Sequence, residues 1–144
     1  MLLNKKITVI MPAYNAEKTL EKTYQEIPHD IVDCVILVDD NSRDNTVSTA
    51  KNLPITEVIV HEKNSGYGGN QKTCYEHALK HNSDIIIMLH PDYQYTPKLI
   101  RAMVSLLAEG EFDIVLGSRI LGNGALKGGM PPYKYISNRA ITLF

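Results

Sequence analysis

The chain has 144 residues, of which 44% are apolar and 22% are charged, and its formal net charge is −1. This is the composition of an ordinary globular domain, which excludes a disordered or a fibrous class. The two signs of charge are mixed along the chain, which excludes the basic footprint of a nucleic-acid binder, so we expect no nucleic-acid partner. The apolar runs are too short to span a bilayer, and residues 1–10 lack the apolar core of a signal peptide, so we expect a cytoplasmic protein.

Short apolar, β-branched runs alternate with helical patterns along the chain. The expected strands cover residues 7–11, 35–38, 58–60, 85–89 and 114–116. The expected helices cover residues 17–27, 46–52, 71–81 and 97–108, with Pro28, Pro54 and Gly110 just beyond three of them. Asp44 or Ser42 is expected to cap the second helix. This order predicts an α/β fold with a mostly parallel sheet that is covered by helices on both faces.

Two further features complete the outline of the chain. Cys34 and Cys74 lack the spacing of a metal site, and we interpret them as buried free thiols rather than as a disulfide. Residues 121–144 begin with glycines and Pro131-Pro132, which predict a flexible loop. The pattern from Tyr135 to Phe144 then predicts the start of a helix with an apolar end. We expect this last segment to be incomplete, with packing partners outside the chain.

Ligand-type residues follow the first two expected strands. In parallel α/β sheets, ligands bind beyond the carboxyl ends of the strands. Tyr14 is suited to stack on a nucleobase, although a turn that packs Tyr14 on the core is the alternative. One of Asp39 and Asp40 is suited to accept a hydrogen bond from a ribose hydroxyl or a base imino group, and the other to cap the next helix. We expect Asp40 to face a cleft, so its replacement by alanine should barely affect folding.

A glycine-rich stretch, residues 64–72, follows the third strand. Its glycines allow a ligand to approach the backbone closely, and Lys72 in the first turn of the next helix would suit a diphosphate. The stretch is neither a Rossmann fingerprint nor a P-loop, so by itself it is a weak signal.

The fourth and fifth strands are followed by candidate metal and phosphate ligands. His90 and Asp92 alternate around Pro91, so both are expected to point toward one small volume. Imidazole, carboxylate and the amide oxygen of Gln94 suit Mn²⁺ or Mg²⁺, with a diphosphate completing the shell. A structural turn is the alternative. Arg119 after the fifth strand suits a bidentate contact to a phosphate.

With these residues, the sequence resembles the family 2 glycosyltransferases of the GT-A fold over nearly its whole length. Within the family it is most similar to the polyprenyl-phosphate sugar transferases, including the dolichyl-phosphate mannosyltransferase type. The residues that carry the resemblance are residues 9–15, residues 38–42 with Asp44 and Thr46, residues 64–69 and residues 117–119. The resemblance implies a nucleotide-sugar-binding core over residues 1–120, and a loop with the start of an acceptor-side helix over residues 121–144.

The strand-end pattern and the resemblance together assign roles to single positions. The catalytic residues would be Asp92, which matches the second acid of the family's Asp-x-Asp metal motif, and Arg119, which would contact the diphosphate. The metal ligands would be Asp92, His90 and Gln94. The donor-binding residues would be Pro12, Ala13, Tyr14, Asn15, Asp39, Asp40, Ser42, Asn64, Gly66, Gly68, Lys72 and Arg119. The acceptor-side residues would be Lys134, Ser137 and Arg139.

Two departures from the family pattern bear on these roles. His90 stands where the family has the first acid of its metal motif. Tyr133 stands where an arginine precedes Ser137, so Lys134 or Arg139 would have to bind an acceptor phosphate in its place.

The resemblance implies a metal-dependent, inverting transfer of a hexose from a nucleoside diphosphate sugar, with Mn²⁺ or Mg²⁺ as the cofactor. The acceptor would be a polyprenyl phosphate, with peripheral membrane contact at the cytoplasmic face through a segment outside the chain. The alternatives are a transferase to a saccharide hydroxyl and a nucleotide-sugar-binding module without catalysis. A nucleotidyltransferase is disfavoured, because no Gly-x-Gly-Thr-Arg loop follows the first strand. Because its acceptor side is incomplete, we expect the chain alone to bind donor but to transfer sugar poorly.

Overall fold

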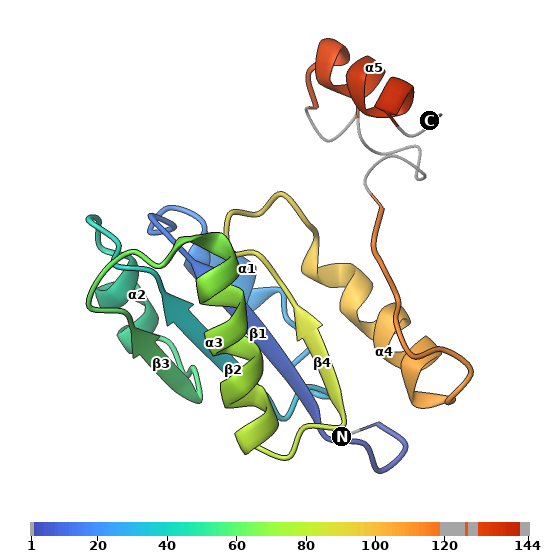
Figure 1. Cartoon of the computed structure of the whole chain (residues 1–144). Helices are drawn as coiled ribbons and strands as arrows, with labels where there is room; N and C mark the ends of the chain where they lie inside the picture. The colour runs from blue at the N-terminus through green and yellow to red at the C-terminus, as the bar shows by residue number, and fades with distance from the viewer. Residues whose placement is uncertain (1, 119–125, 127–129, 142–144) are drawn as a thin grey trace.

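The structure, a computed structural model, describes residues 2–118, 126 and 130–141. Within these residues a four-stranded, wholly parallel sheet has the strand order β3-β2-β1-β4 (Figure 1). Its strands are β1 (Ile7–Ala13), β2 (Cys34–Asp39), β3 (Glu57–Val60) and β4 (Ile85–Met88). Because all strands run in the same direction, their carboxyl ends meet at one edge of the sheet.

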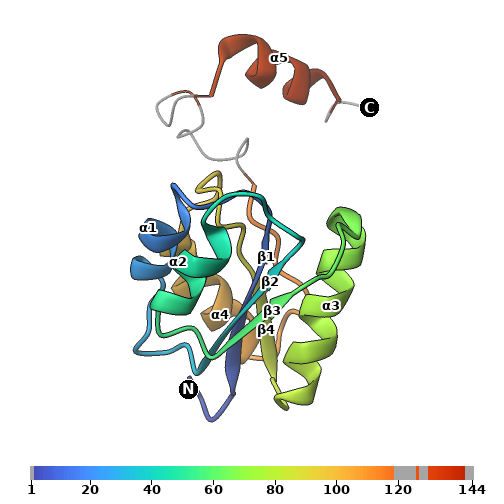
Figure 2. The ribbon, with the colours of Figure 1, turned by 90° about the vertical axis from the view of Figure 1, so that its left-hand side faces the viewer.

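Helices cover both faces of the sheet. They are α1 (Leu20–Gln25), α2 (Thr46–Asn52), α3 (Gly66–Lys80), a 3₁₀ turn η1 (Pro97–Leu99) that leads into α4 (Ile100–Ala108), and α5 (Pro132–Ile141). Figure 2 shows α3 on one face of the sheet and α1, α2 and α4 on the other. No residue of α5 is buried. The predicted α/β fold with a parallel sheet between two helical layers is confirmed.

Two apolar layers attach the helices to the sheet. The larger layer joins side chains of β1 and β2 to Leu20 of α1, Ala50 of α2 and Val104 of α4. The smaller layer lies under α3 and contains Ile10, Cys34, Ile36, Val38, Cys74 and Ala78. Both cysteines are buried and free, as predicted. Burial raises the pKa of the Cys74 thiol to about 12, so this thiol stays protonated at neutral pH.

Strand β1 runs through Pro12, two residues farther than the sequence predicts. Proline cannot donate to a sheet ladder and is normally excluded from a central strand. The Ile10 carbonyl oxygen accepts from Leu89 N–H, so Pro12, two residues on, also turns its nitrogen toward the β4 side. Pairing with β4 has ended there, because its last pair is Ile10 with Met88. The missing N–H therefore interrupts no ladder bond.

Helix α3 begins at Gly66, five residues before the helix predicted over residues 71–81, so most of the glycine-rich stretch is helical. Gly66 has φ +74°, which favours glycine. A Cβ atom on Gly69 would lie 2.9 Å from the Cβ atom of Ser65, so this position needs a glycine for steric reasons. Lys72 consequently lies in the second turn of α3, and its predicted place in the first turn is wrong.

The predicted fifth strand over residues 114–116 is wrong. These residues have no strand partner in the structure, and Ile114 and Leu116 are 75% and 86% exposed. Three apolar residues between Asp113 and Gly117 give too little pattern to fix a strand, whose formation depends on packing against neighbours. Gly110, with φ +81°, follows α4 as predicted. Among the described residues, no helix is both long and apolar enough to cross a membrane.

Candidate functional site

A cleft of about 260 Å³ opens at the carboxyl ends of the strands, and we call it the strand-end cleft. It lies between the tips of β1, β2 and β4 and the first turns of α3. The residues that line it are Pro12, Ala13, Tyr14, Ala16, Asp40, Asn64, Gly66, Tyr67, Asn70, His90, Pro91 and Asp92. The structure therefore brings eight of the predicted site residues to one cavity: Pro12, Ala13, Tyr14, Asp40, Asn64, Gly66, His90 and Asp92.

Tyr14 lines this cleft. It is 51% exposed, so the alternative in which Tyr14 packs on the core is excluded. The turn that carries it is held by Asn15, whose φ of +50° is uncommon outside glycine. Asn15 N–H donates to Ser42 Oγ, and Asn15 Oδ1 accepts from Arg43 N–H, both at 2.9 Å. Asn15 and Ser42 thus tie the loops after β1 and β2 together without lining the cleft.

The two adjacent aspartates at the end of β2 have different roles. Asp39 is fully buried and accepts from Ser42 N–H at 2.8 Å and from the Ser42 hydroxyl, so it holds the turn after β2. It does not line the cleft. The N-cap of α2 is Asn45, whose side chain makes no capping bond, so neither Asp44 nor Ser42 is the cap that the sequence predicts. Asp44, one residue earlier, accepts from Thr46 N–H at 3.0 Å through its Oδ1. Asp40, which is 3% exposed, is the aspartate that reaches the cleft.

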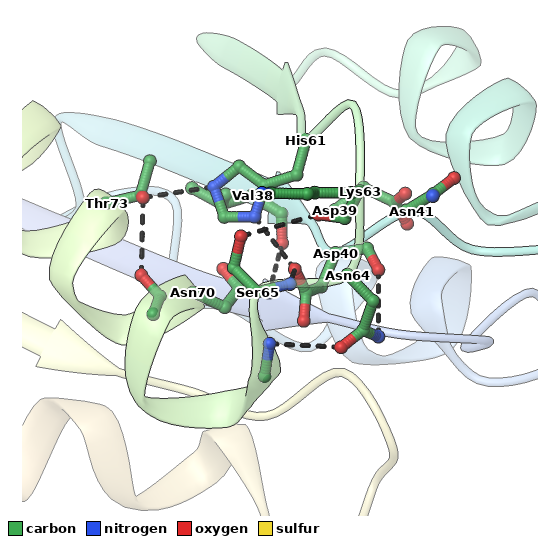
Figure 3. A network of polar contacts seen from close by, with 12 residues as sticks. Val38, Asp39, Asp40, Asn41, His61, Lys63, Asn64, Ser65, Asn70 and Thr73 are labelled. Atoms are coloured by element: carbon green, nitrogen blue, oxygen red, sulfur yellow. Dashed lines mark hydrogen bonds and ion pairs between the residues drawn. The ribbon is translucent and has the colours of Figure 1, made fainter.

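Asp40 is the acceptor of a hydrogen-bond network on the loop before α3 (Figure 3). Its Oδ1 accepts from Ser65 N–H at 2.7 Å and lies 2.8 Å from His61 Nδ1. Its carbonyl oxygen accepts from Asn64 Nδ2 at 3.2 Å. Burial alone would raise the pKa of Asp40, but the hydrogen bonds from Ser65 and His61, with a contribution from Gly66, lower it overall. Asp40 is therefore ionised at neutral pH and can act only as an acceptor.

Asn70 anchors α3 to the tips of the two central strands. Asn70 is 3% exposed, and its Nδ2 donates to the carbonyl oxygens of Val38 at 2.9 Å and Ala13 at 3.3 Å. Because a buried amide needs hydrogen-bond partners, these two bonds hold α3 against the strand tips beside the cleft.

A cluster of aromatic rings stands on the β4 side of the cleft. The rings of Tyr67 and His90 stack with a centroid separation of 5.4 Å, and Tyr95 lies 5.7 Å from His90 on the same measure. The Tyr67 hydroxyl lies 3.1 Å from His90 Nε2 and accepts from Gln71 Nε2 at 2.7 Å. One nitrogen of His90 is therefore engaged by α3, and its orientation is set from there.

Asp92 is the exposed carboxylate of the cleft. Its Oδ1 accepts from Gln94 N–H at 3.0 Å, which closes a short turn after β4. His90 and Asp92 both line the cleft, whereas Gln94 does not. In the described part of the chain, no group of three or more His, Cys, Asp or Glu side chains gathers into a metal site. One carboxylate and one imidazole fit a divalent cation only if a ligand such as a diphosphate supplies further oxygens.

The remaining predicted residues lie elsewhere. Gly68 and Lys72 are exposed on α3 and do not line the cleft. Lys134, Ser137 and Arg139 lie on α5, where the Ser137 hydroxyl donates to the Tyr133 carbonyl oxygen at 2.9 Å. Arg119 lies outside the described residues.

Sequence reasoning missed three residues of this site: His61, Tyr67 and Asn70. His61 directly follows β3, so the strand-end rule that selected the aspartates would also have selected it. Tyr67 and Asn70 precede the helix that the sequence predicts over residues 71–81. Once the helix is known to begin at Gly66, both face the strand tips from its first turns.

The model of the family named Glycosyl transferase family 2 matches residues 8–143. The chain belongs to glycosyl transferase family 2. The predicted resemblance to this family is thereby confirmed.

Relatives within the family include lipid-phosphate sugar transferases. The chain is 29% identical to a UDP-N-acetylglucosamine–dolichyl-phosphate N-acetylglucosaminyltransferase of Methanococcus voltae, over 98% of the chain and 62% of that protein. It is 32% identical to an undecaprenyl-phosphate 4-deoxy-4-formamido-L-arabinose transferase of Yersinia enterocolitica, over 77% of the chain and 36% of that protein. The chain thus spans less than two thirds of the length of these relatives. The predicted likeness to polyprenyl-phosphate sugar transferases is confirmed.

A solved structure shares the fold. Glucosyl-3-phosphoglycerate synthase from Mycobacterium tuberculosis, in complex with Mn²⁺, uridine diphosphate and phosphoglyceric acid, superposes with a TM-score of 0.62 at 25% identity. The superposition covers 75% of this chain and 40% of that one.

Proposed function

We propose that this chain is the donor-binding part of a metal-dependent, inverting glycosyltransferase that moves a hexose from a nucleoside diphosphate sugar to a polyprenyl phosphate. The observation that carries the proposal is the strand-end cleft, which gathers Tyr14, Asp40 and Asp92. An exposed aromatic ring, a buried carboxylate and an exposed carboxylate suit three parts of one ligand. These parts are the base, the hydrogen-bond donors of the nucleoside, and a metal-bound diphosphate.

The nucleoside is expected to bind between Tyr14 and Asp40. The cleft volume of about 260 Å³ is slightly below the ~300–1,000 Å³ of typical ligand pockets, so it suits the nucleoside alone. The base stacks on Tyr14, and Asp40 accepts from an imino N–H or a ribose hydroxyl. The diphosphate then extends toward the first turn of α3 and Asp92. The positive end of the helix dipole at Gly66 favours an anion there.

A divalent cation would be held by Asp92, with His90 as a second candidate ligand and diphosphate oxygens as the remainder. A bound cation would neutralise charge that develops on the departing diphosphate. The protein residues contribute by position, because Asp92 lies at the exit of β4 on a short turn and His90 is oriented by Tyr67. This cation assignment is also supported by the mycobacterial synthase of the same fold, which binds Mn²⁺ and uridine diphosphate.

In the reaction, an acceptor phosphate oxygen forms a bond to the anomeric carbon while the bond from that carbon to the diphosphate oxygen breaks. The electron pair of the broken bond leaves with the nucleoside diphosphate. Attack from the face opposite the leaving group inverts the anomeric configuration. An acceptor phosphate is already ionised and needs no general base, whereas a saccharide hydroxyl would need one. The lipid-phosphate acceptor is supported by the names of the relatives from Methanococcus voltae and Yersinia enterocolitica.

The alternative of a nucleotide-sugar-binding module without catalysis is favoured by one observation. The cleft is lined by donor-side residues, and the acceptor-side candidates on α5 do not line it. Incubation with polyprenyl phosphate and radiolabelled nucleotide sugars separates the two: a labelled lipid product favours the transferase, and binding without product favours the module.

Donor binding is tested by ligand-induced thermal shift with UDP, GDP, CDP and ADP, each with Mn²⁺ or with chelator. A ligand that binds the native state at about 100 times its Kd stabilises it by about 2.7 kcal/mol. We expect at least one nucleotide to raise Tm, and to raise it more with Mn²⁺. Asp92→Asn should remove the Mn²⁺ increment, whereas Asp113→Asn, an exposed aspartate beyond α4, should keep it. An unchanged shift in chelator contradicts the metal assignment, and the absence of any shift contradicts donor binding.

A further inference from the structure

His61 connects the end of strand β3 to the carboxylate of Asp40 and to helix α3. Its backbone N–H donates to the Asp39 carbonyl oxygen at 2.9 Å, which extends the β2–β3 ladder by one residue. Its ring lies between two partners, with Nδ1 2.8 Å from Asp40 Oδ1 and Nε2 3.0 Å from Thr73 Oγ1 (Figure 3). The side chain of His61 is 15% exposed, so this ring is a mostly buried bridge.

The hydrogen bonds of Thr73 allow only certain proton positions on this bridge. The Thr73 hydroxyl lies 3.3 Å from the Gly69 carbonyl oxygen, to which it can donate. With a protonated His61, Nε2–H donates to Thr73 and the hydroxyl donates to Gly69. With a neutral His61, the hydroxyl turns and donates to Nε2. In both states Nδ1 keeps its proton and donates to Asp40, because an ionised carboxylate can only accept.

The hydrogen bond from His61 makes the two carboxylate oxygens of Asp40 unequal. Oδ1 receives donors from His61 and from Ser65 N–H, which is as much as one carboxylate oxygen readily accepts in a crowded site. Gly66 N–H also contributes a hydrogen bond to the carboxylate. Oδ2 is the oxygen that neither His61 nor Ser65 engages, so it is the one open to a ligand in the cleft that Asp40 lines. Because Asp40 is almost fully buried, a small rotation of its carboxylate would change which atom a ligand meets.

We propose that His61 is a positioning residue of the donor site, which acts through Asp40. Its Nδ1–H fixes Oδ1, so that Oδ2 stands at the cleft as an acceptor for the N–H or O–H groups of a nucleoside. Thr73 holds the His61 ring in place, but it does not determine which oxygen of Asp40 faces the ligand. This inference rests on the proposed function, since it assumes that a nucleoside diphosphate occupies the cleft.

Two amide variants test the contact of His61 Nδ1 with Asp40 and the contact of Nε2 with Thr73 one at a time. Asparagine carries its amide nitrogen where histidine carries Nδ1, so His61→Asn keeps a donor to Asp40 and loses the contact with Thr73. Glutamine carries its amide nitrogen where histidine carries Nε2, so His61→Gln keeps the contact with Thr73 and loses the donor to Asp40. Thr73→Val removes the hydroxyl at nearly constant shape and leaves Nδ1 in place.

The measurement is the Kd of UDP with Mn²⁺ by calorimetry, with Tm in the absence of nucleotide as the check on folding. We expect His61→Gln to weaken binding about tenfold or more, as for a lost hydrogen bond to a charged group. His61→Asn and Thr73→Val should stay within about threefold of the unchanged chain. His29→Gln, an exposed histidine after α1, is the matched control and should leave Kd unchanged.

The outcomes separate this inference from the proposed function. If the unchanged chain binds no nucleoside diphosphate, the proposed function fails and the inference fails with it. If the unchanged chain binds UDP and the two His61 variants lose equal affinity, only the role through Asp40 is overturned. A loss in Thr73→Val as large as that in His61→Gln overturns it as well, because the contact with α3 would then be what matters. Should His61→Gln fail to fold, His61→Leu, which also lacks the donor to Asp40, takes its place, and an affinity equal to that of His61→Asn overturns the role through Asp40.

Discussion

His77 Nδ1 lies 2.9 Å from Glu57 Oε1, at the end of α3 that is farthest from the strand-end cleft. His81 Nε2 lies at the same distance from Oε2, the other oxygen of this carboxylate. Glu57 is the first residue of β3, so one side chain ties the last turns of α3 to the edge of the sheet. Asn70 ties the first turns of the same helix to the strand tips. Helix α3, which forms one wall of the cleft, is therefore fixed at both ends by polar contacts.

The contact of Glu57 with two histidines predicts an acid-sensitive contribution to stability. Burial alone would raise the pKa of Glu57, but hydrogen bonds and attraction from His81 and His77 lower it below its ordinary value of 4.5. A carboxyl whose pKa is depressed by folding stabilises the native state above its unfolded pKa, and this contribution is lost as the pH falls through the lower, folded pKa. The contribution should thus be complete above about pH 5 and should disappear below pH 4.5.

Urea unfolding between pH 3 and pH 7 checks this expectation. Glu57→Gln should be less stable than the unchanged chain at pH 6, and the difference should shrink as the pH falls below 4.5. Glu76→Gln, an exposed residue of the same helix, is the control. A difference between Glu57→Gln and the unchanged chain that does not depend on pH would contradict the assignment to ionised Glu57.

Replacing Asp40 by asparagine should change the base preference of the cleft. Oδ1 faces two donors, His61 and Ser65 N–H, so asparagine will place its oxygen there and its NH₂ group toward the ligand. The cleft then offers a donor in place of an acceptor. We expect the ratio of Kd values for CDP and UDP to shift by about tenfold in favour of CDP, whose base has an acceptor where uracil has an N–H.

Asp40→Ala is the companion variant, measured by calorimetry and by urea unfolding. It should weaken both nucleotides alike, and it should lower stability by about 1–3 kcal/mol because buried donors lose their acceptor. The sequence alone led us to expect that Asp40→Ala would barely affect folding, whereas the buried hydrogen bonds of Asp40 predict a loss of stability. Parallel losses for CDP and UDP in Asp40→Asn would mean that Asp40 does not contact the base.

Removing the hydroxyl of Tyr67 should weaken metal-dependent binding while leaving the aromatic stack in place. Tyr67→Phe retains a ring against His90 but loses the 3.1 Å contact with Nε2 and the bond from Gln71. Partners that orient a metal-binding histidine typically contribute about 10–100-fold in affinity, so the Mn²⁺ increment in UDP binding should fall by about tenfold. Tyr75→Phe, an exposed tyrosine of the same helix, should not change it. An unaltered increment in Tyr67→Phe would remove His90 from the candidate metal ligands.

Asn70 should contribute to stability through its buried amide. Asn70→Ala removes the amide donor to the carbonyl oxygens of Val38 and Ala13, although the Ala13 oxygen still accepts from Asp40 N–H at 2.9 Å. We expect a loss of about 1–3 kcal/mol in the free energy of unfolding in urea, because buried hydrogen bonds are lost. Asn52→Ala, at the exposed end of α2, should cost much less. Equal losses would show that water replaces the Asn70 amide at no cost.

The sequence by itself determined the alternation of strands and helices, because buried strands and amphipathic helices leave different periodicities. It also determined that Tyr14, Asp40, His90 and Asp92 would meet, because residues that follow parallel strands share one edge of the sheet. Neither inference needed the exact ends of an element.

The tertiary structure alone decided what each polar group contacts. Asp39 and Asp40 are equivalent in the sequence, yet one is turned toward Ser42 and the other toward Ser65 and the cleft. The roles of Tyr67 and Asn70 depend on where α3 begins, and the structure starts this helix at Gly66, not at the predicted residue 71. The apolar run over residues 114–116 formed no strand, because strand formation depends on a partner that local pattern does not specify. Hydrogen-bond partners that lie tens of residues apart follow from the packing of whole elements, which no local pattern of the chain encodes.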